Sequence, residues 1–153
     1  MTNIDERKKQ RIQFFKNDQL RHENFKYGEL IIQTNKVQWY LTYIIFLRAS
    51  RPTKKLEKYL ERLELGSLIE CFSICIKTPL ESELSGSLQL YKKGRNALAH
   101  QMFTNKKLTI KECELSIELG NLILGELEKV FEFEWKRLES KIINLKLNKN
   151  IKK

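Results

Sequence analysis

Apolar residues recur every three or four positions over most of the chain, which is the spacing of one buried face on an α-helix. The chain has only two prolines, Pro52 and Pro79, so few positions interrupt a helix. No stretch alternates apolar and polar residues as a half-buried strand does. The sequence therefore predicts an all-α protein, an up-and-down bundle of four to five helices with a long C-terminal helix.

The N-terminal half of the chain is expected to hold the first three helices. The first runs from about residue 4 to residue 50, with or without a break near Gly28, and ends before Pro52. Thr53 is a good N-cap for the second helix. Gly66 and the serine after it either break this helix or lead into a third, which ends near Lys77.

The C-terminal half is expected to hold two further helices. Residues 78–79 and 85–86 carry turn chemistry and are expected to bracket a loop, after which Ser87 caps a helix over residues 88–103. Thr109 begins the long final helix, which keeps an apolar spacing of three and four over many turns. No internal repeat or linker interrupts the chain, so we expect one domain over residues 1–147 and a flexible basic tail over residues 148–153.

The formal net charge of +10 is concentrated in two segments. One runs from Leu84 to Lys111 and the other from Ser140 to Lys153, and neither contains an acidic residue. A basic stretch of this kind suits a polyanion such as RNA, because its lysines and arginines displace the counterions of the phosphates. For the tail, improved solubility is an equal alternative.

Targeting and metal-binding signals are both weak. The N-terminus has the mixed charge of a soluble segment and not of a signal peptide, and the longest uncharged apolar run, residues 37–47, is about half of a membrane span. We therefore expect a cytoplasmic protein without a membrane segment. Cys71, Cys75 and Cys113 make an odd total that fits a reducing compartment, and their spacing predicts small buried side chains and no metal or other cofactor.

The helix expected over residues 88–103 carries the segment with the most suggestive chemistry. Asn96 and His100 are one turn apart, on the side facing away from the apolar stripe, and Arg95 leads the same patch. An arginine can bind a phosphate through two hydrogen bonds, and a histidine can transfer protons near neutral pH. The stripe itself is formed by Leu88, Tyr91, Gly94, Leu98 and Met102.

The segment from Arg95 to His100 reads Arg-Asn-Ala-Leu-Ala-His, and it resembles the signature of the HEPN superfamily, an arginine, a polar residue, three variable positions and a histidine. The segment over residues 65–69 is similar to one that many HEPN proteins carry upstream of the motif. The specific part of the resemblance is the six residues of the motif.

This resemblance implies a metal-independent endoribonuclease in which the 2′-hydroxyl of the RNA attacks the adjacent phosphate and leaves a 2′,3′-cyclic phosphate end. His100 would then transfer protons, Arg95 would neutralise charge on the reacting phosphate, and Asn96 would orient the histidine or hold a phosphate oxygen. One candidate substrate is tRNA. The residues expected to bind the RNA backbone are Lys92, Lys93, Lys106 and Lys107.

The resemblance also implies a homodimer paired through the motif helix, a role as a toxin or in phage defence, and an antitoxin or another regulatory protein as partner. The subfamily paired with nucleotidyltransferase antitoxins has a tyrosine where this chain has Met102, so control by modification of that tyrosine is in doubt. The alternative function is a non-catalytic helical module that binds RNA or protein.

Overall fold

The computed structural model describes residues 2–103 and 110–151, with side chains described for residues 26–100 and 111–151 and for Glu6, Lys9 and Gln10. Within these ranges the chain forms helices joined by short turns, which confirms the all-α prediction. The five described helices are α1 (Thr2–Arg48), α2 (Lys54–Glu61), α3 (Leu65–Ile74), α4 (Pro79–Phe103) and α5 (Ile110–Ile151).

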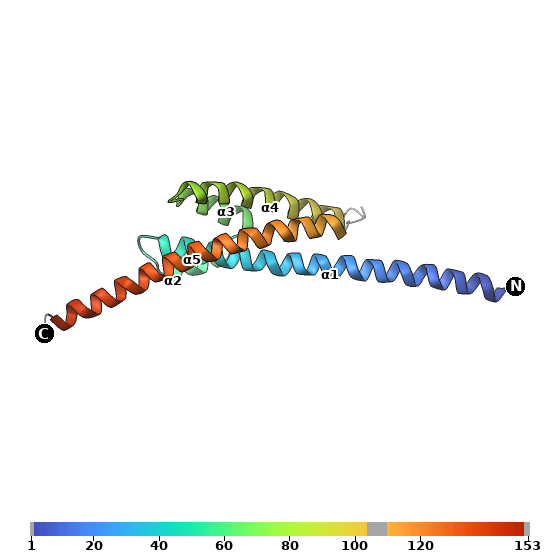
Figure 1. Cartoon of the computed structure of the whole chain (residues 1–153), viewed down its shortest axis with the longest axis horizontal. Coiled ribbons are helices and arrows are strands. Elements are labelled where there is room, and N and C mark those ends of the chain that lie inside the picture. Colours follow the sequence, from blue (N-terminus) through green and yellow to red (C-terminus); the bar gives the residue numbers. More distant parts are fainter. Residues whose placement is uncertain (1, 104–109, 152–153) are drawn as a thin grey trace.

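The two longest helices, α1 and α5, pack against each other, and α4 packs against α5 and is hydrogen-bonded to α1 as well (Figure 1). Helix α3 contacts both α1 and α4, and α2 packs on α1. The N-terminal half of α1 and the C-terminal part of α5 extend past this body in opposite directions (Figure 1). The molecule is therefore elongated, with one packed body between two helical arms.

The core draws on all five helices, because each turns one apolar stripe inward. Its buried apolar side chains are Leu30, Val37, Leu41 and Ile44 of α1, Leu60 of α2, Leu65, Leu68, Ile69 and Phe72 of α3, Leu84, Leu88, Tyr91 and Leu98 of α4, and Cys113, Ile123 and Leu127 of α5.

The N-terminal elements follow the sequence closely. Helix α1 continues through Gly28 without a break, since one glycine costs a helix only about 1 kcal/mol relative to alanine. Thr53 caps α2 as expected, its Oγ1 accepting a hydrogen bond from the backbone N–H of Leu56 at 3.2 Å. Gly66 lies in the first turn of α3, which is a separate helix and ends at Ile74.

The predicted loop between residues 78 and 86 is wrong, because α4 begins at Pro79 and not at Leu88. Thr78 caps this helix, its Oγ1 accepting a hydrogen bond from the backbone N–H of Glu81 at 3.3 Å. Proline is well suited to the first helical position, where its missing N–H has no helical partner. At the other end of the chain, α5 continues past the predicted boundary at Leu147 to Ile151, and the predicted start at Thr109 lies outside the described residues.

A buried ion network joins the C-terminal end of α1 to α4 and α5. Arg48 donates from Nε to Glu134 Oε1 of α5 at 3.0 Å, and from a terminal nitrogen to the carboxylate of Glu81 of α4. The side chains of Arg48 and Glu134 are only 3% and 0% exposed. Because buried charges are tolerated only when they are paired, this contact requires the three helices to meet in one arrangement.

Further donors hold the two carboxylates in their charged form. Burial by itself would raise the pKa of Glu134, but hydrogen bonds from Lys77 and Arg48 outweigh it, and the pKa lies below its ordinary value. Burial would likewise raise the pKa of Glu81, but hydrogen bonds from Arg48 and Thr78 outweigh it, and this pKa also lies below its ordinary value. Arg137 adds a contact to Glu134 Oε2 at 2.9 Å.

We predict that acid destabilises the fold through this network. A carboxylate whose pKa is depressed by folding contributes stability above the pKa of the unfolded chain, and this contribution is lost as the pH falls through the folded value. The free energy of unfolding, measured by urea denaturation, should therefore fall below about pH 4.5. Glu134→Gln should lower it at pH 7 by about 3 kcal/mol and should make it less dependent on pH.

Glu126→Gln is the matched control for this prediction, because Glu126 is an exposed residue of the same helix that pairs with Lys129 at 3.0 Å. An exposed ion pair contributes about 1 kcal/mol or less, so this variant should unfold nearly as the parent chain does. Equal stability of the two variants at pH 7 would contradict a structural role for the network.

Candidate nucleic-acid interface

The motif lies in the last turns of α4, and its polar side chains face outward. Asn96 and His100 are exposed and Arg95 is half-buried, whereas Leu98 between them is buried in the core. The orientation expected from helical spacing is therefore confirmed. The buried stripe includes Leu88, Tyr91 and Leu98, and the side chain of Met102 lies outside the described residues.

The structure brings Arg95 and Asn96 of the motif into contact. Arg95 donates from a terminal nitrogen to Asn96 Oδ1 at 3.4 Å, a long hydrogen bond that places the guanidinium beside the amide. His100 follows Asn96 by four residues and so lies on the same face of the helix. A cation, an amide and an imidazole therefore share one outer surface of α4.

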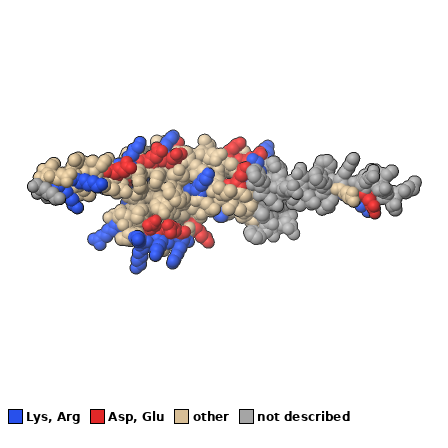
Figure 2. All heavy atoms as spheres, turned by 90° about the horizontal axis from the view of Figure 1, so that it is seen from below, with Lys and Arg blue, Asp and Glu red and all other residues tan. Residues whose placement is uncertain are grey.

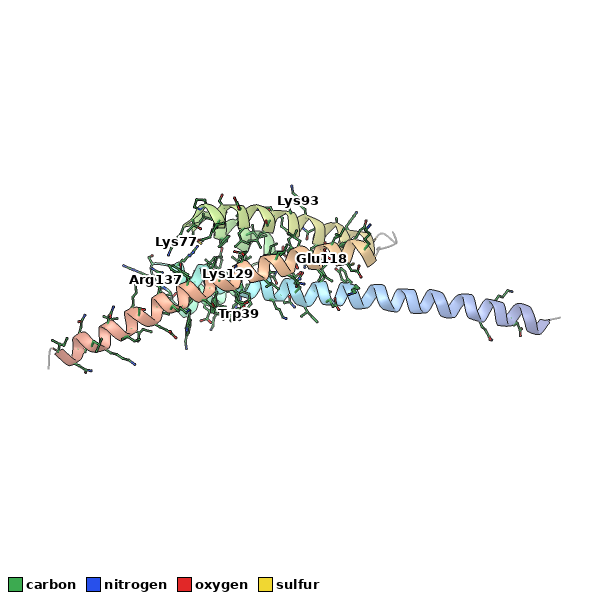
Figure 3. The ribbon with its side chains drawn as sticks, viewed as in Figure 1. Trp39, Lys77, Lys93, Glu118, Lys129 and Arg137 are labelled. Atoms are coloured by element: carbon green, nitrogen blue, oxygen red, sulfur yellow. The ribbon has the colours of Figure 1, made fainter. Side chains whose placement is uncertain are left out.

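The predicted RNA-binding lysines divide into two groups. Lys93 is exposed and points away from the body on the outer side of α4 (Figure 3). Lys92 is half-buried, and its Cδ lies 3.5 Å from the place where a Cβ on Gly66 of α3 would stand. Lys106 and Lys107 lie outside the described residues. Lys92 and Lys93 extend the basic character of the motif surface by one turn.

A buried hydrogen-bond network supports α4 one turn before the motif. The Tyr91 hydroxyl donates to Gln33 Oε1 of α1 at 3.0 Å, and Thr34 Oγ1 lies 3.0 Å from the same hydroxyl. Gln33 Nε2 then donates to the carbonyl of Ile117 at 2.8 Å and to Asn121 Oδ1 at 2.9 Å, both on α5. Three helices are thus tied together directly beneath Arg95.

Gly120 of α5 makes room for this network. A Cβ at position 120 would stand only 2.0 Å from Gln33 Oε1, so the amide could not stay where it is. Helical spacing predicts Tyr91 in the apolar stripe but assigns no role to Gln33 or Gly120. The available signal was the tyrosine itself, because a buried hydroxyl needs a polar partner.

The Tyr91 hydroxyl acts as a hydrogen-bond donor and not as a base. Burial raises its pKa, and the hydrogen bond with Thr34 and the positive charge of Arg95 oppose that shift only in part. The phenol therefore stays protonated at neutral pH. Its contribution to the motif surface is positional, through the backbone of α4.

The described residues offer no site for a metal ion, since no three of their His, Cys, Asp and Glu side chains gather closely enough to hold one. Cys113 is buried, and Cys71 and Cys75 are half-buried free thiols. Burial raises the pKa of the Cys75 thiol, although the neighbouring charge of Arg48 works against it.

A pocket of about 290 Å³ lies at the other end of α4 from the motif. Its apolar lining comes from Leu80, Leu84, Val130 and Phe133. Its charged lining side chains include Arg48 and Glu81, which pair with each other in the ion network. The pocket is thus separate from the motif surface and offers it no further catalytic group.

Several aromatic residues of α1 and α5 form a half-exposed cluster. The ring centroids of Trp39 and Phe131 are 5.4 Å apart, and those of Phe131 and Trp135 are 6.2 Å apart in a stacked arrangement. Trp39 and Trp135 remain 49% and 47% exposed. The cluster packs against the core, and about half of each tryptophan still faces solvent.

No protein-family model, curated protein or solved structure matches the chain. None of the described helices combines the length and the apolar character needed to cross a lipid bilayer. The geometry of the motif surface and the chemistry of its residues are therefore the guide to the function of this protein.

We predict that Gly120→Ala destabilises the fold and that Gly125→Ala, its matched control on the same helix, does not. The added methyl group at position 120 displaces the Gln33 amide and breaks its buried hydrogen bonds, which should cost about 1–3 kcal/mol despite the higher helix propensity of alanine. Position 125 has no atom within 4 Å of an added Cβ, so alanine there should be neutral or stabilising. Chemical denaturation of both variants gives the comparison, and equal stability would contradict the role of Gly120.

Proposed function

We propose that the protein is a metal-independent endoribonuclease of the HEPN type. The observation that carries this proposal is the placement of Arg95, Asn96 and His100 on one outer face of α4, away from the core of an all-helical bundle. Side chains that only stabilise the core would face inward. An outward cation, amide and imidazole on a basic helix suit a phosphate that arrives from solvent.

In this mechanism the 2′-oxygen of the RNA attacks the adjacent phosphorus as the bond to the 5′-oxygen breaks, which gives a 2′,3′-cyclic phosphate and a 5′-hydroxyl. His100 accepts the proton of the 2′-hydroxyl or donates one to the leaving 5′-oxygen. Arg95 neutralises the charge that builds on the phosphate oxygens, and Asn96, held beside it, orients the imidazole or binds one of these oxygens.

A second copy of the chain completes this site. Cleavage needs both a base and an acid, and two motif helices facing each other across a two-fold axis would supply two copies of His100. The outer face of α4 suits such pairing, because Leu90 is 63% exposed and the small residues Gly86 and Ala97 permit close approach along the same face.

The second candidate function is a non-catalytic module that binds RNA or protein. The open position of the motif favours it, since Asn96 and His100 are exposed on the single chain.

Under the catalytic proposal the protein acts in the cytoplasm as a toxin or phage-defence effector, with an antitoxin or regulatory protein as partner. Under the binding proposal the basic face of α4 holds RNA without cutting it.

Cleavage of total RNA and tRNA in EDTA tests the catalytic proposal. We expect the parent chain to cut RNA to cyclic phosphate ends, and His100→Ala to lower the rate by about 100-fold or more because proton transfer is lost. His22→Ala is the matched control, since it removes the other histidine of the chain and should leave the rate unchanged. Intact RNA, or equal rates for His100→Ala and the parent, would refute His100 as the catalyst.

Salt dependence of RNA binding tests the basic surface separately. Replacing both Lys92 and Lys93 by alanine should reduce the slope of log affinity against log salt by about 1.4 for single-stranded RNA, because two phosphate contacts are lost. Lys129→Ala, which removes an exposed lysine of α5 paired with Glu126, should leave the slope unchanged. RNA binding that depends on Lys92 and Lys93 but is never followed by cleavage would favour the binding module.

A further inference from the structure

The C-terminal part of α5, residues 138–151, forms an arm that leaves the body (Figure 1). Every residue from Glu139 to Ile151 is exposed, yet the arm is rich in large apolar side chains. Figure 2 shows lysine side chains among uncharged atoms along the outer part of this arm, on the left of the view. The exposed apolar residues are Ile142, Ile143, Leu145, Leu147 and Ile151.

Such an arm needs a partner for stability. Most of the stability of a helix in a protein comes from the packing of its apolar face, and the arm has no such packing within the described chain. The arm also exposes between 44% and 81% of each of these five side chains. The exposed apolar surface and the lack of packing both indicate that another helix covers part of it.

One apolar stripe of the arm continues a stripe that is partly packed against the body. Phe131, Trp135, Leu138, Ile142 and Leu145 follow one another at spacings of four, three, four and three, the heptad repeat of a coiled coil. Trp39 of α1 contacts Phe131 at the start of this seam, and Leu138 is half-buried. From Ile142 onward the seam has no helix of its own chain against it in the described structure.

The charges beside the seam select both the partner and its direction. Lys141 precedes Ile142, whereas Glu139 and Lys146 follow Leu138 and Leu145 on the other flank. Two parallel arms would set Lys141 against Lys146 of the second copy, like charges. Two antiparallel arms instead bring the same flanks together, so that Glu139 meets Lys146 twice and Lys141 meets the neutral Asn148.

We propose that the α5 arms of two copies of this chain pair as a short antiparallel coiled coil, with Ile142 of each copy layered against Leu145 of the other. In this register the arm ends opposite residue 136 of the second copy, where the body begins, so the two bodies lie at opposite ends without overlap. The pairing uses a surface distinct from the motif face of α4, and it does not rest on the proposed ribonuclease function.

An anionic membrane fits the arm less well. A helix that lies in a membrane surface needs one apolar face and one polar face. Here Ile143 and Leu147 lie about 140° and 180° around the helix from Leu138, so apolar residues occupy opposite sides. The heptad seam with complementary flanking charges favours a second helix.

Sedimentation equilibrium of the full chain over a wide concentration range tests the interface. We expect association that Ile142→Asn weakens by about tenfold or more, because each dimer contains two copies of the altered layer. Leu147→Asn is the matched control, because Leu147 is another exposed apolar residue of the arm but lies outside the seam, and this variant should leave association unchanged. Both side chains are exposed, so neither substitution disturbs the core.

Charge reversals test the direction of pairing. Glu139→Lys and Lys146→Glu should each weaken association, and the double variant should restore it, since the opposed charges are exchanged. Lys141→Glu should have little effect, because it faces Asn148 in the antiparallel pair. Stronger association of Lys141→Glu would indicate the parallel arrangement and would overturn the proposal.

A chain that stays monomeric at all concentrations, or one whose association is insensitive to Ile142→Asn, would also overturn it. A third result would overturn it too: the chain does not associate, yet it binds vesicles of anionic lipid or RNA, and Ile142→Asn abolishes that binding. The RNA cleavage assay with His100→Ala reads out the motif and not the arm, so failure of either proposal is distinguishable from failure of the other.

Discussion

The buried contact of Arg48 with Glu81 and Glu134 is the constraint on which the arrangement of the long helices depends. Apolar packing has no direction and tolerates many crossings of two helices, whereas a buried guanidinium requires its carboxylates at fixed places. Glu81 lies in the first turn of α4, and the Tyr91 hydroxyl holds the same helix near the motif. With both contacts made, the rotation of α4 about its axis is set, and with it the face that carries Asn96 and His100.

The parts of this fold that the sequence could predict are those governed by local periodicity. The helical spacing of Leu88, Tyr91 and Leu98 was enough to turn Asn96 outward, as the structure confirms. Capping residues are harder to interpret: Thr53 caps α2 as predicted, but the Thr78–Pro79 pair begins α4 and not the predicted loop. Turn-forming residues suit a helix start equally well, and a helix that starts at Pro79 brings Glu81 to the buried Arg48.

The polar contacts inside the bundle could not be predicted, because their partners are far apart in the chain. Arg48 and Glu134 are separated by 86 positions, and Gln33 and Asn121 by 88. A sequence with many charged residues offers many such pairs, and periodicity does not choose among them. The role of Gly120 could not be predicted for the same reason, since the space that it leaves matters only once Gln33 is in place.

The two proposed contacts between copies have different geometrical consequences. Antiparallel arms hold two bodies at opposite ends of the coiled coil, so their own α4 helices cannot face each other. A motif pair must then form with a third copy, and two different two-fold contacts on one chain lead to larger assemblies. Arm pairing would therefore raise the local concentration of motif surfaces without itself building a catalytic site. Arm association would then affect cleavage by changing the local concentration of motif surfaces. It would leave the chemistry of Arg95, Asn96 and His100 unchanged.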